Sequence, residues 1–504
     1  MKRGYVKTVL MSLALTLGLF AGSSVDAFAD KASDAAAGSV LTLNEVKTDS
    51  IEQKGGEKWY QFNLTEAGYF RIHIGPGEKV DKDEIGWGWE AAFYKKGELE
   101  ESIIEIGGVD SLKKSCWLAF DPGTYYIQVK ERNEMYDTKG NPFDLKVEFN
   151  KSDIWESESN GNYKVADVIK TNTTYKGNLY NKDDVDYYKY TVTKDGYQSI
   201  TVTPDPDLRD EEDLGWGWNI TVLDADGSSE LFALDKITAT KTTLNYPMKK
   251  GDYYVKVQAE APAFSPKQQV YDLKVNETEA AGWEAEHNDL QKDANPISLD
   301  TPYKALTYRG EDKDFFTFDI PVKGIVTLNM AKDPDTDSDK VSWGWDVELT
   351  AENGSKSVFS KDKVTTSITE EMVLPAGKYY LLVKPTSSYF WPKECMYNFS
   401  VKYEGFDQAM AKTTVKIKKP KAKGGKITVK WNKNDLASGY EVYRSTKAKK
   451  GFKKVKSVSS KKLSYVDKKV KAKKTYYYKV RAYIKVDGKK YYSQYSAVKK
   501  VKAK

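Results

Sequence analysis

The sequence predicts an all-β protein built from tandem sandwiches, and three observations lead to that prediction. The tripeptide Trp-Gly-Trp occurs three times, with its copies 129 and 127 residues apart. This period is too regular for chance and far longer than the roughly 20–50 residues of a solenoid repeat, so it implies three homologous domains. The 35 Tyr, 18 Phe and 12 Trp residues alternate with Thr, Val and Lys, whereas apolar stretches at helical spacing are scarce. The 504 residues suffice for three such domains and a remainder.

Each domain repeats the same succession of short strands. An aromatic strand comes early, at residues 59–62, 187–190 and 315–318. Late in each domain a turn glycine leads into a paired-tyrosine strand, at residues 123–126, 251–254 and 377–380. Many short strands separated by turn signals indicate a two-sheet antiparallel sandwich. The predicted sandwiches are residues 38–150, 151–277 and 278–405.

The first 29 residues are predicted to be a secretory signal peptide. They begin with Lys2, Arg3 and Lys7, continue with an apolar run over residues 9–22, and end in a small-x-small sequence before Asp30. That run is too short to span a bilayer comfortably and nothing similar follows, so no transmembrane segment is expected. We therefore expect a secreted, extracellular protein whose mature chain starts with a flexible leader, residues 30–37.

The second and third sandwiches open with related acidic segments. These are Trp155-Glu156-Ser157-Glu158-Ser159-Asn160 and Trp283-Glu284-Ala285-Glu286-His287-Asn288. Each segment is followed by an Asp-x-Asp pair, whose second aspartate is Asp186 in one sandwich and Asp314 in the other. Aromatic residues come directly after each pair. Together with the late Gly-x-Tyr-Tyr strand, this order resembles the bacterial pre-peptidase C-terminal (PPC) domain, a jelly-roll-like sandwich appended to many secreted peptidases. Collagen-binding domains of clostridial collagenases belong to the same broad group. The resemblance implies three PPC-like sandwiches.

The acidic segments supply oxygen ligands of the kind that Ca²⁺ takes. Carboxylates and an Asn amide, brought from an N-terminal segment onto a strand edge, are hard ligands. Because this segment carries calcium ligands in the related collagen-binding domains, the resemblance implies Ca²⁺ in the second and third sandwiches. The implied ligands are Glu284, Glu286, Asn288 and Asp314, with Glu156, Glu158, Asn160 and Asp186 as their counterparts. The alternative is that these side chains cap turns and bond backbone amides on a solvated surface.

The first sandwich departs from this pattern. It lacks the Glu-x-Glu-x-Asn opening, and its Asp-x-Asp positions are Gly56 and Lys58. A lysine there places a cation where the metal would lie. We therefore expect no calcium in the first sandwich.

The Trp-Gly-Trp motif admits two interpretations. Residues i and i+2 of a strand project from one face, so we expect paired indoles on one face and a bare glycine on the other. Paired indoles suit stacking on a sugar ring, which makes a candidate ligand platform. The six candidates are Trp87, Trp89, Trp216, Trp218, Trp343 and Trp345. Recurrence in the first sandwich, which lacks the acidic opening, favours packing within the sandwich, and the bare glycine favours close approach by a neighbouring segment.

The C-terminal stretch is a polycation. Residues 412–504 hold 32 Lys and Arg against 4 Asp and Glu, a net charge of +28, which leaves −22 on the residues before it. Beyond a linker over residues 406–412, Trp431 and the Tyr-x-Val-Arg-Ala strand that begins at Tyr478 resemble a fibronectin type III module of secreted Gram-positive proteins. The resemblance implies a lysine-rich immunoglobulin-like sandwich over residues 413–504. Such asymmetry indicates an anionic partner. Nucleic acid is not expected for an exported protein, so we expect residues 412–504 to bind an anionic cell-envelope polymer, with simply solvated lysines as the alternative.

Signatures of catalysis are missing from the sequence. Its two histidines, His73 and His287, have no triad context, and there is no Gly-x-Ser-x-Gly or His-Glu-x-x-His motif. Two carboxylates suffice for a glycosidase, so residue type alone leaves a secreted hydrolase open. We predict a non-catalytic protein that adheres to a cell-wall polymer, a polysaccharide or an extracellular matrix protein, with the basic module as an electrostatic tether. The alternative is a structural spacer or display protein of the cell surface.

Overall fold

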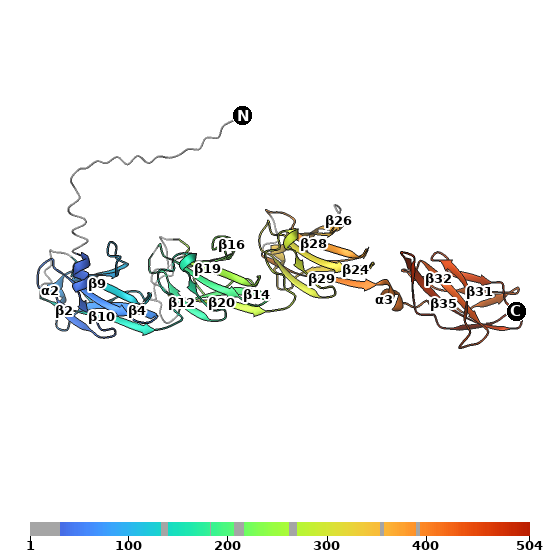
Figure 1. Ribbon diagram of the computed structural model, residues 1–504, viewed down its shortest axis with the longest axis horizontal. Helices are drawn as coiled ribbons and strands as arrows, with labels where there is room; N and C mark the ends of the chain where they lie inside the picture. The colour runs from blue at the N-terminus through green and yellow to red at the C-terminus, as the bar shows by residue number, and fades with distance from the viewer. Residues whose placement is uncertain are drawn as a thin grey trace, which may run out of the picture. The chain divides into compact units, whose positions relative to one another are not determined.

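β-Strands dominate the protein, which confirms the predicted all-β class (Figure 1). The computed structural model describes residues 31–132, 140–181, 183–205, 216–261, 270–352, 357–389 and 394–504. Within those residues, no helix is both long enough and apolar enough to cross a membrane. The predicted signal peptide lies outside the described residues.

The first sandwich consists of two five-stranded sheets. One has the strand order β1-β3-β9-β5-β6; the other has the order β2-β10-β4-β7, with β8 also paired to β4. The bounds are β1 (Ser39–Val40), β2 (Lys47–Ser50), β3 (Glu57–Leu64), β4 (Gly68–Pro76), β5 (Trp89–Lys95), β6 (Ile104–Val109), β7 (Lys113–Lys114), β8 (Leu118–Ala119), β9 (Gly123–Glu131) and β10 (Pro142–Lys151), with the short helix α2 (Lys82–Ile85) before β5. Strand β1 runs parallel to its neighbour, β3.

The second sandwich repeats this topology. Its sheets have the orders β11-β13-β19-β15-β16 and β12-β20-β14-β17, with β18 paired to β14. The bounds are η1 (Tyr163–Val165), β11 (Asp167–Val168), β12 (Thr174–Asn178), β13 (Val185–Val192), β14 (Gly196–Pro204), β15 (Trp218–Leu223), β16 (Glu230–Ile237), β17 (Lys241–Thr242), β18 (Tyr246–Pro247), β19 (Gly251–Ala259) and β20 (Val270–Glu279).

The third sandwich has the sheets β21-β23-β28-β25-β26 and β22-β29-β24-β27. The bounds are η3 (Gln291–Asp293), β21 (Asn295–Pro296), β22 (Pro302–Thr307), β23 (Asp314–Ile320), β24 (Gly324–Lys332), η4 (Ser338–Val341), β25 (Trp345–Ala351), β26 (Ser357–Val364), β27 (Ser367–Leu374), β28 (Gly377–Pro385) and β29 (Cys395–Gly405). The predicted aromatic strands correspond to β3, β13 and β23. The predicted paired-tyrosine strands correspond to β9, β19 and β28.

The C-terminal module follows the helix α3 (Phe406–Ala411), which lies within the predicted linker. A three-stranded sheet, β30-β31-β34, faces a second sheet, β33-β32-β35-β36, in which β37 also pairs with β35. The bounds are β30 (Lys421–Lys423), β31 (Lys426–Lys430), β32 (Gly439–Ser445), β33 (Lys453–Ser459), β34 (Ser464–Asp467), β35 (Thr475–Val486), β36 (Lys489–Tyr492) and β37 (Lys499–Lys502). Trp431 and Tyr478 are buried in the core between these sheets.

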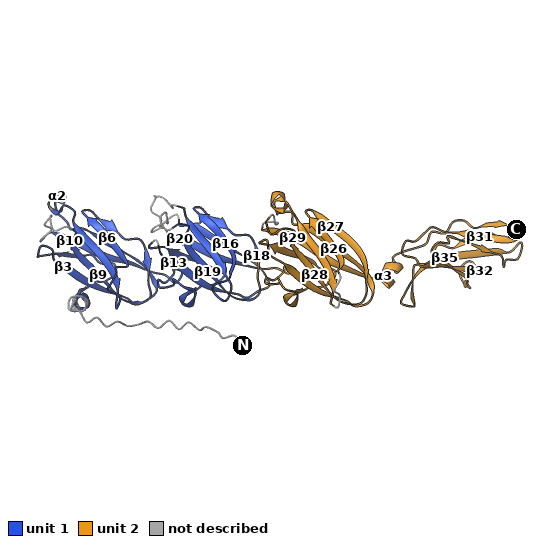
Figure 2. Cartoon of the chain, turned by 90° about the horizontal axis from the view of Figure 1, so that it is seen from above, with its two compact units in different colours: residues 1–194, 198–245, 250–278 blue, residues 195–197, 246–249, 279–504 orange. Residues whose placement is uncertain are grey.

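Contacts along the chain divide it into two compact units, which Figure 2 shows in different colours. The first unit holds the first sandwich and most of the second. The second unit holds the third sandwich, the C-terminal module, and residues 195–197 and 246–249.

Alternating strands place aromatic side chains between the two sheets of each sandwich. In the first sandwich, Phe62 of β3 packs edge-on against Phe70 of β4, with their ring centroids 5.4 Å apart. The same core includes Trp89 and Phe143, whose rings are 5.5 Å apart. Burial of such aromatic area is the main favourable contribution to the stability of each sandwich.

The leader is ordered, contrary to the prediction that residues 30–37 are flexible. Residues 31–37 are helical. Ala35 is fully buried against Trp59, Tyr94 and Tyr126, and the ammonium group of Lys31 donates a hydrogen bond of 2.7 Å to the carbonyl oxygen of Leu99. A composition rich in Ala, Asp and Ser suggested disorder, but a single small apolar residue suffices to dock this turn of helix onto an aromatic surface.

The Trp-Gly-Trp motif does not present two indoles on one face, so that expectation is wrong. Each strand begins at the second tryptophan, and Trp89, Trp218 and Trp345 are fully buried. The intervening glycines have positive φ angles of 64°, 80° and 71°, which turn the first indole away from the second. These glycines are Gly88, Gly217 and Gly344.

The motif glycine also permits a close approach by the neighbouring strand, as predicted. A Cβ atom on Gly88 would lie 1.9 Å from the carbonyl oxygen of Val109 in β6. The corresponding distances are 2.3 Å for Gly217 and 2.5 Å for Gly344. Any larger residue would therefore collide with backbone as well as adopt a disfavoured conformation.

Replacing the second tryptophan of a motif is expected to destabilise its sandwich far more than replacing the first. Trp345→Ala removes a buried indole, which typically costs about 3–5 kcal/mol, and its Nε1 atom no longer donates to the hydroxyl of Thr307. Trp343→Ala alters a side chain that is 39% exposed and should cost less than about 1 kcal/mol. Urea unfolding with hydrogen exchange of the β25 amides measures both changes. Equal destabilisation by the two substitutions would contradict the distinction.

The buried carboxylate of Glu441 should make the C-terminal module sensitive to acid. Burial alone raises the pKa of Glu441, but hydrogen bonds from Tyr443, Arg481 and Lys454 outweigh it and lower the pKa to about 2, against an ordinary value of 4.5. The stabilisation is therefore complete above pH 4.5 and is lost as the pH falls towards 2.

Glu441→Gln should accordingly destabilise the module by about 2 kcal/mol at pH 7, because it leaves Arg481 without its carboxylate. The difference from the unmodified chain should shrink as the pH falls from about 4.5 to about 2. Hydrogen exchange of the β32 and β35 amides at several pH values reports it. A difference that does not depend on pH would show that the charge on Glu441 is not the cause.

Candidate metal centres and exposed indoles

The acidic segment of the second sandwich lies extended beside β12. Trp155 forms a parallel bridge with Lys176, and the amide of Glu156 donates to the carbonyl oxygen of Lys176 over 2.9 Å. The same segment reaches back to the first sandwich, where the amide of Glu158 donates to the carbonyl oxygen of Ala119 over 2.7 Å. Alternate side chains of an extended segment share one side, which places the two glutamates together.

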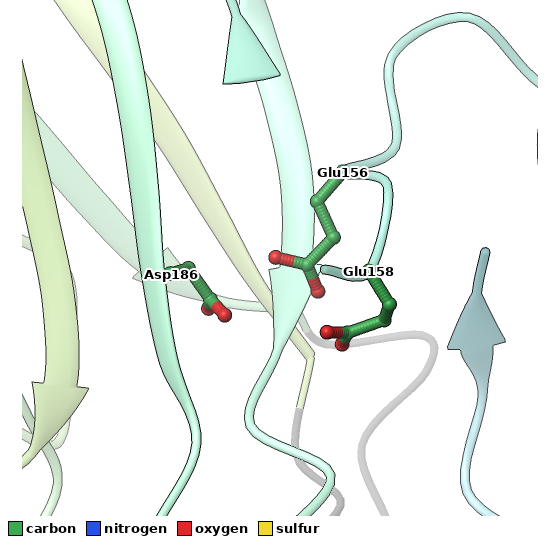
Figure 3. A group of neighbouring side chains, drawn as sticks. All are labelled: Glu156, Glu158 and Asp186. Carbon is green, nitrogen blue, oxygen red and sulfur yellow. The ribbon is translucent and has the colours of Figure 1, made fainter. Parts of the chain in front are cut away.

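Two groups of three carboxylates result, one in the second sandwich and one in the third. In each group, carboxylate oxygens of all three residues lie within 4.8 Å of one another. The groups are Glu156, Glu158 and Asp186, and Glu284, Glu286 and Asp314. Figure 3 shows the first group, in which the two glutamates of the acidic segment and Asp186 of β13 converge. The six predicted carboxylates are thus assembled as two sets of three.

The surrounding residues hold one side of each group. In the second sandwich, the oxygens of Glu156 accept hydrogen bonds from the amide of Asn178 (2.6 Å) and the hydroxyl of Tyr188 (2.7 Å). Asp186 accepts one from the hydroxyl of Tyr271. The third sandwich repeats the pattern, with Leu306 donating its amide to Glu284 and Tyr397 donating its hydroxyl to Asp314.

The asparagines of the two segments are buried, and their amide nitrogens are engaged. The Nδ2 atom of Asn160 donates to Asp167 over 3.1 Å. The Nδ2 atom of Asn288 lies 3.4 Å from Glu284 and 3.5 Å from Asn295. In both residues the Oδ1 atom is thereby left as the free end of the amide.

The other side of each group consists of buried oxygens that lack a hydrogen-bond partner among the described residues. They are Oε1 of Glu158, Oδ1 of Asn160 and Oδ1 of Asp186, and in the third sandwich Oε1 of Glu286, Oδ1 of Asn288 and Oδ1 of Asp314. All six residues are at most 5% exposed. A buried oxygen without a partner costs free energy, and the same three recur in both sandwiches. These oxygens fit a hard cation. Of the alternative interpretation, the backbone-amide bonds are present at Glu156 and Glu284, but the groups are buried and do not lie on a solvated surface.

Burial and mutual repulsion act in the same direction on these carboxyls. Burial raises the pKa of Glu156 to about 8, and it raises that of Asp184, the neighbour of Asp186 along β13, to about 7. For Glu158, burial and the neighbouring carboxylates together raise the pKa well above its ordinary value. The corresponding groups of the third sandwich behave in the same way, with Asp312 at about 7. A proton or a bound cation would offset this concentration of negative charge, in addition to the hydrogen bonds described above.

Some residues of these centres were not predicted from the sequence. Asp167 accepts from Asn160 and from the amide of Ser157, and Asn295 has the equivalent role in the third sandwich. Each follows the second glutamate of its acidic segment by nine positions, a recurrence that could have identified them. Tyr271 and Tyr397 could also have been identified from the sequence. The two sandwiches with an acidic segment have a tyrosine at this strand position, whereas the first sandwich has Phe143.

Lys58 of the first sandwich occupies the strand position of Asp186 and Asp314. Lys58 pairs with Val129 in the register of β3 and β9, just as the two aspartates pair with Val257 and Val383 in their own sheets. Its ammonium group forms an ion pair with Asp49, which also accepts a hydrogen bond of 2.9 Å from the hydroxyl of Tyr60. The side chain that replaces the acid therefore has its own carboxylate partner.

The first tryptophan of each motif is exposed and lies beside a cation. Trp87 and Trp216 are each 51% exposed, and Trp343 is 39% exposed. The guanidinium of Arg132 lies 5.1 Å from the ring centroid of Trp87, and the ammonium groups of Lys236 and Lys363 lie 5.9 Å and 5.1 Å from Trp216 and Trp343. The candidate platform is thus three single indoles, each paired with a cation. These basic residues were not predicted, since Arg132 comes from a different element than Lys236 and Lys363.

Comparisons with known proteins match parts of the chain. No protein-family profile matches the chain. Collagenase ColA of Clostridium perfringens is 24% identical over 215 residues, which cover 42% of this chain and 18% of the collagenase. Because less than a fifth of that protein is matched, the activity of the whole enzyme says nothing of this chain.

Solved structures with similar domains include two bacterial proteins and one animal protein. The pre-peptidase C-terminal domain of a collagenase from Bacillus anthracis is 23% identical and covers 22% of this chain and 94% of its own, with a TM-score of 0.18. A Fn3-like protein from Clostridium thermocellum is 24% identical over 17% of this chain and 86% of its own, with a TM-score of 0.15. A two-domain fibronectin type III segment of chicken tenascin is 14% identical over 38% of this chain and 97% of its own, with a TM-score of 0.22. Identities and scores at this level assign no ligand.

Proposed function

We propose that the protein is a secreted, non-catalytic adhesive protein whose three sandwiches contact a polysaccharide or an extracellular matrix protein. The observation that carries the proposal is the half-exposed indole that recurs in all three sandwiches. The second tryptophan is buried in the core of each sandwich, whereas the first leaves between 39% and 51% of its surface exposed. Exposed aromatic residues are enriched where proteins bind partners, and three weak sites on one chain gain strength by acting together.

The basic module supplies a second attachment in this proposal. Its net charge of +28 over residues 412–504 favours an anionic polymer of the cell envelope. An attachment of this kind is weakened by salt, because charges more than about 8 Å apart are screened at physiological ionic strength. The sandwiches and the module are therefore assigned different partners.

Ca²⁺ is proposed as the cation of the second and third sandwiches. Glu156, Glu158, Asn160 and Asp186, and in the third sandwich Glu284, Glu286, Asn288 and Asp314, would hold it. Their unpaired buried oxygens support the proposal, and Ca²⁺ takes 6–8 oxygen ligands in flexible geometry. The ion would supply the positive charge that lets the carboxyls ionise inside the sandwich. No calcium is proposed for the first sandwich, where Lys58 supplies the charge.

A spacer or display role is the second candidate, and one contact favours it. Trp155, at the start of the second sandwich, stacks on Tyr69 of the first with ring centroids 4.4 Å apart and an interplanar angle of 15°. Trp117 packs edge-on against the same tyrosine at 4.9 Å. Such a buried aromatic contact suits a chain that holds successive sandwiches in a fixed relation. A secreted hydrolase has no comparable observation in its favour.

Calcium is expected to stabilise the second and third sandwiches and not the first. At a concentration about 100 times the dissociation constant it adds about 2.7 kcal/mol to the free energy of unfolding. Hydrogen exchange of the full chain with Ca²⁺, with Mg²⁺ and with chelator should therefore show slower exchange in β13 and β23 with calcium, and no change in β3. The double variant Glu158→Gln and Glu286→Gln should lose the response.

The matched control for that experiment replaces exposed glutamates of the same sandwiches, Glu230→Gln and Glu371→Gln. It should retain the full calcium response. Exchange rates that are identical with and without chelator would remove the metal from the proposal, and a stronger response to Mg²⁺ would change its identity.

Removing the exposed indoles should abolish adhesion without unfolding the sandwiches. The triple variant Trp87→Ala, Trp216→Ala and Trp343→Ala is compared with the unmodified chain in sedimentation with insoluble polysaccharides, purified cell walls and fibrillar collagen. Each indole is expected to contribute about 1–2 kcal/mol of contact free energy, so the triple variant should bind at least tenfold more weakly.

The control for adhesion removes one exposed apolar residue from each sandwich away from the motif, as Leu112→Ala, Val168→Ala and Tyr389→Ala. These side chains are 62%, 78% and 85% exposed. Equal binding by both triple variants would discard the indoles as contacts. If the unmodified chain sediments with none of the three materials, the adhesive role fails and the spacer role gains support.

A further inference from the structure

A lysine-lined pocket lies on the outer face of the sheet β30-β31-β34. In β31 the side chains of Ile427 and Val429 point into the core, whereas Thr428 and Lys430 point outward. The preceding chain runs beside the end of this strand, because the amide of Lys418 donates to the carbonyl oxygen of Lys430 over 2.8 Å. These neighbours enclose a cavity of about 290 Å³.

Four of the five residues that line the cavity are lysines. They are Lys418, Lys419, Lys421 and Lys430, and the fifth is Thr428. Lys421 and Thr428 lie opposite each other in the register of β30 and β31. All four lysines are exposed, whereas Thr428 is half-buried between them. Four like charges around one cavity of this size create a positive local potential.

The acids of the module do not neutralise this charge. Each of the four has a basic partner elsewhere, namely Asp435 with Lys433, Glu441 with Arg481, Asp467 with Arg444, and Asp487 with Lys323. Within the described residues, no ion pair involves any of the four pocket lysines. The pocket therefore lacks an anion that the chain itself could supply.

The other sheet of the module differs in this respect. Its central cation, Arg481, bonds Glu441 at 2.8 Å and lies 3.6 Å from the ring centroid of Tyr492. Lys479 lies 3.5 Å from the ring centroid of Tyr495. These two cations already have partners within the protein, whereas the four pocket lysines surround one shared cavity.

We propose that this pocket binds the phosphate groups of a phosphodiester polymer. The proposal rests on the tether role proposed above and assigns that role to one site and one chemical class. Ammonium groups bind phosphate as point charges from several directions, and the hydroxyl of Thr428 adds a donor at a fixed position. The volume lies at the lower limit of ordinary ligand pockets and suits one small repeating unit rather than a folded partner.

The test compares two triple variants of the full chain that lose the same charge. The pocket variant carries Lys418→Gln, Lys421→Gln and Lys430→Gln. The control variant carries Lys456→Gln, Lys500→Gln and Lys502→Gln, which alter exposed lysines of β33 and β37 on the other sheet. Binding to poly(glycerol phosphate) and to polygalacturonate is measured by calorimetry at about 0.15 M salt, where the Debye length is about 8 Å. Circular dichroism checks that both variants are folded.

The pocket variant should bind poly(glycerol phosphate) at least about tenfold more weakly than the unmodified chain, and the control variant no more than about threefold more weakly. Equal losses would show diffuse attraction, which overturns the pocket and leaves the tether standing. Tighter binding of the unmodified chain to polygalacturonate would overturn phosphate as the preferred group. If the unmodified chain bound neither polymer, the tether itself would fail.

Discussion

A carboxylate buried in a protein needs a positive partner, and much of this chain is arranged around that requirement. In the first sandwich the ammonium group of Lys58 pairs with the half-buried Asp49. The C-terminal module meets it with Arg481, which bonds the buried Glu441. The second and third sandwiches bring three carboxylates together without any basic residue in the group. The same strand position thus holds a lysine in one repeat and an aspartate in the other two.

The repeats differ at two positions together: the acid or lysine of the centre, and the tyrosine or phenylalanine of the last strand. Where the acid is present, a tyrosine hydroxyl from the last strand bonds it, as Tyr271 does for Asp186. Where the lysine is present, Phe143 stands at the position of that tyrosine, and the acid partner of the lysine is Asp49 on the neighbouring strand. A buried hydroxyl without an acceptor would cost free energy. The substitution of one residue in the centre therefore goes together with the substitution of another on the facing sheet.

The sequence was sufficient to predict the fold class, the succession of strands and the carboxylates that assemble in each centre. These features depend on period-two alternation and on fixed spacing, which are properties of the chain alone. The geometry of Trp-Gly-Trp could not be predicted, because it depends on a positive φ angle at the glycine that strand periodicity does not describe. The docked helix at residues 31–37 was missed because Ala35 packs on side chains more than twenty residues away. Pocket residues such as Lys418 and Lys430 become neighbours only through a backbone hydrogen bond between segments.

The turn at the motif glycine places the two tryptophans in different environments, one inside the core and one at the surface. Trp89 is enclosed by the core, so its size is set by the surrounding packing. Trp87, two residues earlier, lies largely outside the core, and the space around it is not fixed by the fold. A substitution at the outer position therefore leaves the core intact, whereas a substitution at the inner position does not. A tandem chain built in this way can acquire a new surface specificity one repeat at a time, without a compensating change in any core.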